Sequence, residues 1–217
     1  MASPEYLFLR AAKTLPPVHL IAFGYALCGT YYLSGPDQRT SLSSTSKLAR
    51  YLNRCEGMHG IKRARQALRH VLDDAASARE ATTAMKLTLP CRMGGYGLPH
   101  PTLNKRIDLP TQARTALGKS HVRIDLGWTA IKTGIEYDSD QWHTGSARIA
   151  RDSRRRNELA SLNFDIITIT NDEMKSVVDM DRIAKTLAKK LHVRTRPAVK
   201  DYERLKADLR DILEGWA

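Results

Sequence analysis

Apolar side chains recur every three to four residues through the first third of the chain, which is the period of an amphipathic helix. Pro16 and Pro17 separate the first two of these segments, and Pro90 ends the last. Ser77, followed three residues later by Glu80, forms a capping-box pattern at the start of that last segment. The pattern predicts helices over residues 4–13, 19–27, 47–54, 61–72 and 77–89.

Short alternating and β-branched segments follow, and these are typical of strands. A tight turn at Thr129 and Ala130 joins two of them into a hairpin, which places Asp125 opposite Gly134 and makes Glu136 its diagonal neighbour. A hairpin followed by a helical crossover to one more strand predicts an α/β fold with a mixed sheet covered by helices. We expect strands at 105–109, 122–128, 131–137 and 164–170, and helices at 146–162, from a cap at Asn171 and Asp172, at 179–191 and at 201–213.

Composition narrows the class of partner. The 217 residues include 35 Lys and Arg against 23 Asp and Glu, a formal net charge of +12. Such an excess is typical of proteins that meet nucleic acid or an anionic membrane surface, although solubility alone also accounts for it. The hydrophobic fraction of 42% excludes a disordered chain, and no apolar run is long enough to span a membrane.

Targeting and cysteine patterns indicate a cytoplasmic protein. The apolar segment 18–27 has no basic region before it and no small-residue cleavage site after it, so we do not expect a signal peptide. Cys28, Cys55 and Cys91 are odd in number and widely spaced, which favours a reducing compartment over a disulfide framework or a zinc site.

Acidic residues gather in the segment 122–143, against the basic trend of the whole chain. Glu136 and Asp138 lie two residues apart on one strand and therefore share a face, and Asp125 lies on the neighbouring strand. Carboxylates crowded on one face repel one another unless a cation lies among them, and Mg²⁺ prefers carboxylate oxygens. Solvent-facing strand ends or partners of the many arginines are the alternative interpretation of the same acids.

The segments RIDLGW and IEYDSDQWH resemble the PD-(D/E)xK, restriction-endonuclease-like superfamily. More closely, they resemble the endonuclease-like domain related to very short patch repair (Vsr) nucleases in small bacterial, actinobacterial-type proteins. The resemblance covers roughly residues 76–169. The matching positions are Asp125, Glu136, Asp138, Gln141 and His143, then Asp152 and Arg155 on a helix, a hydrophobic strand at 166–169, and Glu80 upstream.

This resemblance implies a restriction-endonuclease-like mixed-sheet core with the order αβββαβ, flanked by helices. The core would span 76–195, after a helical N-terminal region at 1–75 and before a C-terminal helix at 196–217. The implied activity is that of a divalent-metal-dependent DNA endonuclease, a phosphodiester hydrolase that uses Mg²⁺ or Mn²⁺.

The resemblance also implies the roles of individual residues. Asp125 and Glu136 would hold the metal, with help from Glu80 through water, and Asp138 would complete the acidic site. His143 would position or deprotonate the attacking water, since histidine titrates near neutral pH. Gln141 would orient a neighbouring group.

The predicted helix after the acidic segment is rich in arginine. Arg148, Arg151 and Arg155 recur at spacings of three and four residues and therefore share one helix face, which would bind DNA phosphates beside the scissile bond. An exposed helix face with internal ion pairs is the alternative.

Two positions depart from the family pattern. The lysine that follows the second acid in the superfamily is absent and Asp138 stands there, and Ser139 replaces the signature glycine. These departures keep open a second hypothesis, a catalytically inactive DNA-binding regulator or antitoxin-like protein on the same fold. RNA cleavage is a third. The oligomeric state and the target do not follow from the sequence.

Overall fold

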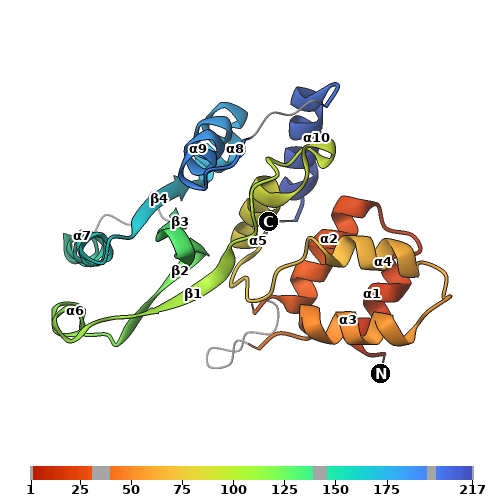
Figure 1. Cartoon of the computed structure of the whole chain (residues 1–217), viewed down its shortest axis with the longest axis horizontal. Coiled ribbons are helices and arrows are strands. Elements are labelled where there is room, and N and C mark those ends of the chain that lie inside the picture. The colour runs from red at the N-terminus through yellow and green to blue at the C-terminus, as the bar shows by residue number, and fades with distance from the viewer. Residues whose placement is uncertain (1, 31–39, 139–145, 195–198, 217) are drawn as a thin grey trace. The chain divides into compact units, whose positions relative to one another are not determined.

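The computed structural model describes residues 2–30, 40–138, 146–194 and 199–216. The chain divides into two compact units, one made of Met1–His100 with Thr195–Ala217 and the other of Pro101–Arg194. The first is helical and the second contains the β-sheet (Figure 1). The sequence predicted boundaries near residues 75 and 195. In the structure the helix over Ala78–Thr88 belongs to the helical unit, so the expected core of 76–195 does not coincide with either unit.

The helical unit follows the apolar periodicity of the sequence. Ser3, Ser44 and Ser77 each cap a helix by accepting a backbone N–H through the hydroxyl. Gly24 of α2 lets Val71, which follows α4, pack closely against the helix, because a Cβ at Gly24 would lie 2.5 Å from Val71 Cγ2. None of the described helices is long and apolar enough to cross a membrane. The unit contains α1 (Pro4–Ala11), α2 (Pro17–Cys28), α3 (Thr45–Arg54), α4 (Ile61–Leu68), α5 (Ala78–Thr88), the short helix η1 (Cys91–Met93) and α10 (Tyr202–Glu214).

The second unit is built on a four-stranded mixed sheet in the order β1-β2-β3-β4. Adjacent strands pair antiparallel from β1 to β3, whereas β3 and β4 are parallel and are connected by helix α7 (Ser146–Ser161). The mixed sheet and its helical crossover confirm the predicted α/β class. The strands are β1 (Thr102–Asp108), β2 (His121–Trp128), β3 (Thr133–Asp138) and β4 (Asp165–Thr170).

One helix of this unit was not predicted. Helix α6 (Thr111–Leu117) lies between Pro110 and Gly118, which adopts a left-handed conformation with φ 63°. Its seven residues are too few to show a helical period, so the sequence suggested only a connection. Its Ala113 is buried in a small core with Leu109, Val122, Ile124 and Leu159 of α7, and this packing explains why the short segment is helical.

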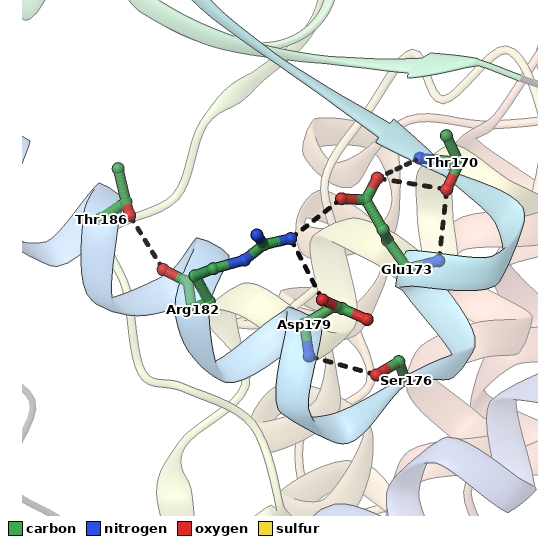
Figure 2. A network of polar contacts seen from close by, with 6 residues as sticks. All are labelled: Thr170, Glu173, Ser176, Asp179, Arg182 and Thr186. Carbon is green, nitrogen blue, oxygen red and sulfur yellow. Dashed lines mark hydrogen bonds and ion pairs between the residues drawn. The ribbon is translucent and has the colours of Figure 1, made fainter.

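A polar network holds the two helices that follow β4, α8 (Asn171–Lys175) and α9 (Val177–Lys190) (Figure 2). Thr170 and Glu173 form a reciprocal capping box, so the cap lies at Thr170 rather than at the predicted Asn171 and Asp172. Arg182 of α9 donates to Glu173 at 3.2 Å and to Asp179 at 3.1 Å. The network connects the C-terminal end of β4 to α9.

Candidate active site

The hairpin register differs from the predicted one and changes which residues adjoin the acids. Leu126 pairs with Ile135 and Gly127 with Gly134, and the paired ladder ends there, with Asp125 and Glu136 as the adjoining residues on the two strands. The predicted turn was two residues too short, because a 3-10 turn over Thr129–Ile131 and Lys132, with φ 49°, connects the strands. The predicted pairing of Asp125 with Gly134 is therefore wrong, because Gly134 pairs with Gly127, and Asp125 and Glu136 instead adjoin the last pair of the ladder on neighbouring strands.

Asp125 is held by a backbone donor of the neighbouring strand. Its Oδ2 accepts a hydrogen bond from the Tyr137 N–H at 2.8 Å. Burial raises the pKa of the Asp125 carboxyl above its usual range, against the smaller opposing effects of this hydrogen bond and of the positive charge of Arg155. A buried carboxylate with a raised pKa is stabilised in its charged form by any further cation that approaches it.

Glu136 meets that cation directly. Arg155 Nη2 lies 2.6 Å from Glu136 Oε1, in an ion pair whose side chains are 35% and 14% exposed, respectively. The same guanidinium donates to the carbonyl oxygen of Arg123 on β2. Leu159, one turn further along α7 and only 1% exposed, anchors the helix over this face of the sheet. Arg155 therefore contacts β2 through the Arg123 carbonyl oxygen and β3 through the Glu136 carboxylate.

The backbone around the acids is irregular. The β1–β2 register runs without a shift from the pair Leu103 and Leu126 to the pair Lys105 and Ile124, which sets Asn104, whose φ is 45°, opposite Asp125. Arg123 Nη1 donates to the Asn104 carbonyl oxygen at 3.0 Å and braces this irregularity. The positive φ of Asn104 therefore marks a local backbone distortion opposite the strand position that carries the buried acid, without a change of register.

Gly134 occupies the position two residues before Glu136, on the same face of β3. A Cβ at Gly134 would lie 2.5 Å from Ile124 Cγ2 and 3.2 Å from Ile166 Cδ1. Because Gly134 has no side chain, Ile124 of β2 and Ile166 of β4 pack over β3 beside Glu136. Asp138, at the end of the same strand, is exposed and lies on the same face by alternation.

Glu80, which was expected to help hold a metal, instead binds groups at the start of its own helix. It lies on α5 in the helical unit, where its Oε2 accepts from the Ala76 N–H at 2.8 Å and its Oε1 from the Ser77 hydroxyl at 3.1 Å. Its side chain therefore helps to cap its own helix, through the Ala76 N–H and the Ser77 hydroxyl rather than through the Ser77 N–H of the predicted capping box.

Several predicted site residues are not described. Gln141 and His143 lie outside the described residues, and the side chains of Arg148 and Arg151 lie in the part of α7 whose side chains are not described. Of the three arginines predicted to bind DNA, Arg155 alone has a described side chain, and it contacts Glu136. Among the described residues, no three His, Cys, Asp or Glu side chains gather closely enough to hold a metal ion.

Two contributors to the site were not predicted in these roles. The Tyr137 N–H binds Asp125, and no sequence signal identifies a backbone donor of this kind. Arg155 was expected to face DNA but pairs with Glu136. The four-residue spacing between Arg155 and the apolar Leu159 is the signal that turns this arginine toward the sheet.

Two curated relatives are similar to this chain. Both are uncharacterized proteins of Mycobacterium tuberculosis, from strains CDC 1551 / Oshkosh and ATCC 25618 / H37Rv, and each is 29% identical over 135 residues. The matched region covers 62% of this chain and 44% of each relative, so the chain matches less than half the length of these proteins. No family model matches the chain, and no solved structure matches it.

Proposed function

We propose that this protein is a divalent-metal-dependent DNA endonuclease built on a restriction-endonuclease-like core. The observation that carries the proposal is the position of Arg155 of α7, which forms an ion pair with Glu136 of β3 and whose charge also acts on the buried Asp125 of the neighbouring strand β2. The order β1, α6, β2, β3, α7, β4 contains the three strands, helix and strand that the sequence resemblance implies, with the short helix α6 inserted between the first two strands. The proposed fold rests on the resemblance of the sequence motifs to the restriction-endonuclease-like superfamily.

The donor set fits a divalent cation. Asp125 and Glu136 offer carboxylate oxygens from adjacent strands, and Mg²⁺ and Mn²⁺ favour such ligands together with water. Burial raises the pKa of Asp125, which shows that its anionic form lacks full compensation from Arg155 and Tyr137. A bound divalent cation polarises a phosphate and lowers the pKa of a water. Both oxygens of Glu80 serve a helix cap, so the proposed ligand set rests on Asp125 and Glu136.

The remaining residues act on the DNA. With a metal held by Asp125 and Glu136, the guanidinium of Arg155 would be available to the phosphodiester and would stabilise negative charge on the phosphate oxygens. Arg148 and Arg151 hold neighbouring phosphates of the backbone. His143 positions or deprotonates the attacking water, Gln141 orients it, and Asp138 completes the acidic site.

One observation favours a second candidate, a DNA-binding regulator without hydrolysis. The Arg155–Glu136 ion pair already neutralises one of the two acids, so the fold balances this charge with its own side chain. The absence of the superfamily lysine, with Asp138 in its place, points the same way. A regulator would bind DNA in a salt-dependent manner whether or not metal is present. RNA cleavage by the same site is tested by adding an RNA substrate.

The test is a cleavage assay on supercoiled plasmid, single-stranded DNA and RNA with Mg²⁺, Mn²⁺ or EDTA. The full chain is compared with Asp125→Asn and Glu136→Gln, and with Asp108→Asn as the matched control, because Asp108 is an exposed acid on β1 that pairs with Arg106. We expect metal-dependent cutting that falls at least a hundredfold in both site variants and is unchanged in Asp108→Asn. EDTA-resistant DNA binding without cutting of any substrate, under conditions where the variants bind equally, contradicts the nuclease proposal and supports the regulator.

A further inference from the structure

The helical unit contains a cavity that the proposed nuclease site does not use. Its volume is about 670 Å³, within the range of small-molecule sites in proteins. It lies between α2, α4 and the segment around η1, all within the helical unit. Helices α2 and α4 pack side by side there (Figure 1).

The floor of this cavity is apolar. Leu20 and Ile21 of α2 form its packed base, each only 1% exposed, and Pro17, Pro90 and Met93 give the apolar surface above them that is open to water. A flat, apolar group such as a nucleobase removes this surface from water, whereas an inorganic ion does not.

The wall of the cavity is basic. Each titratable side chain among the described residues that line it is an arginine or a histidine: Arg63, Arg69, His70 and Arg92. Arg63 serves the fold, because its guanidinium donates to the carbonyl oxygens of Lys13 and Leu15. The guanidinium groups of Arg69 and Arg92 form no hydrogen bond or ion pair with any described residue, which leaves their donors for a ligand.

The electrostatics of the wall favour an anion. Burial, and then the positive charges of His100, Arg92 and Arg69, lower the pKa of His70, so these cations lie near enough to His70 to oppose its protonation. Pro17, the first residue of the twelve-residue helix α2, also lines the cavity, and no side chain caps this helix. The positive end of the α2 dipole therefore adds to the potential.

We propose that this cavity binds a nucleoside phosphate, with the base against Pro17, Pro90 and Met93 and the phosphate held by Arg69 and Arg92. The apolar floor and the basic wall together match the two halves of a nucleotide, whose aromatic base is joined through a sugar to a dianion. The nucleotide is either free or part of a single strand. This site is distinct from the acids of the sheet unit, and its function does not rest on the proposed hydrolysis.

The experiment measures binding to the full chain in EDTA, so that cleavage plays no part. Isothermal titration compares dAMP, dTMP and ribose 5-phosphate, and fluorescence anisotropy follows a labelled twelve-nucleotide single strand. The variants are Arg69→Gln, Arg92→Gln and their combination. Lys62→Gln is the matched control, because Lys62 is an exposed cation on α4 that does not line the cavity. Circular dichroism and thermal melting confirm that each variant is folded.

We expect a nucleotide or the single strand to bind, with affinity about tenfold weaker for each arginine removed and unchanged in Lys62→Gln. We also expect ribose 5-phosphate to bind more weakly than dAMP, because it lacks the base. Binding of dAMP or dTMP identifies a free nucleotide as the ligand, and binding of the strand alone identifies a nucleotide within a chain. Three results overturn the proposal: no binding of any probe at millimolar concentration, equal weakening in Lys62→Gln, or equal affinity for dAMP and ribose 5-phosphate.

Discussion

Arg155 Nη2 lies 2.6 Å from Glu136 Oε1 and connects the helix that crosses the sheet to the acid beside Asp125. Glu136 is mostly buried and has lost much of its hydration, whereas Arg155 keeps a third of its side chain exposed to water. The structure therefore holds two acids on neighbouring strands beside one partly exposed cation of α7. This relationship governs both the stability of the unit and the way in which a metal would enter it.

Replacing Arg155 leaves Glu136 without its cation. We expect Arg155→Gln to lower the free energy of unfolding by about 1–3 kcal/mol in EDTA, because a mostly buried carboxylate loses its partner. Urea denaturation at pH 7 measures the loss. Arg156→Gln, which removes an exposed charge from the same helix, is expected to change the free energy by less than about 0.5 kcal/mol.

The same variant tests whether a metal and Arg155 serve the same acids. Magnesium at millimolar concentration is expected to restore part of the stability lost in Arg155→Gln, because a ligand that binds the native state alone stabilises it. The restoration should disappear when Glu136→Gln is added. A loss of stability that Mg²⁺ leaves unchanged would separate the ion pair from metal binding.

Asp125 gives a prediction with a defined pH dependence. Burial raises the pKa of Asp125 in the folded protein above the value of 3.8 of an unburied aspartate, so the folded state binds this proton more tightly than the unfolded state does. The ionised carboxyl therefore lowers stability, and the penalty develops as the pH rises from 3.8 through the raised pKa. We expect Asp125→Asn to be more stable than the natural chain at pH 7 by about 1 kcal/mol, with the difference vanishing below pH 3.8.

Chemical denaturation at a series of pH values checks this sign. Asp108→Asn is the control, since the Arg106 guanidinium lowers the pKa of Asp108 and its carboxylate is exposed. That variant is expected to lose a little stability at pH 7 rather than gain it. A gain at pH 7 in Asp108→Asn, or a loss in Asp125→Asn, would be inconsistent with the assigned environments.

Gly134 is expected to tolerate no side chain. A Cβ there meets Ile124 Cγ2 at 2.5 Å, in a packed region between β2 and β4, so Gly134→Ala should lower the free energy of unfolding by about 1–3 kcal/mol. Gly127→Ala provides the comparison from the directly paired position, where the nearest atom is Lys105 Cβ at 3.2 Å. Urea denaturation should show the larger loss for Gly134→Ala, and equal losses would contradict the close packing.

Much of the fold was predictable because local periodicity and caps decide it. The helical segments, the four strands and the crossover helix α7 all carry their period in the sequence, and Ser77 with Glu80 marks a helix start that the structure confirms. The helix α6 was missed because its seven residues are stabilised by Ala113 in a tertiary core rather than by a local pattern.

The site was predictable in its residues but not in its geometry. Asp125 and Glu136 follow from the sequence motif, but their alignment depends on the turn, and turn length is the least constrained feature of a hairpin. The left-handed Lys132 extends the connection, and a shift of two residues moves Asp125 from Gly134 to Glu136. The inward direction of Arg155 depends on Leu159 packing against the sheet, a tertiary effect that a charge count cannot show.

The corrected register is itself testable by cross-linking. Directly opposed residues on antiparallel strands have Cα atoms about 4.5–5.5 Å apart, which a disulfide can span. In a background with Cys28, Cys55 and Cys91 replaced by serine, Asp125→Cys with Glu136→Cys is expected to form a disulfide under mild oxidation. Arg123→Cys with Glu136→Cys, another pair implied by the shorter turn, should remain reduced. Mass spectrometry of the proteolysed protein identifies the linked peptides, and preferential linkage of the second pair would restore the two-residue turn and separate Asp125 from Glu136.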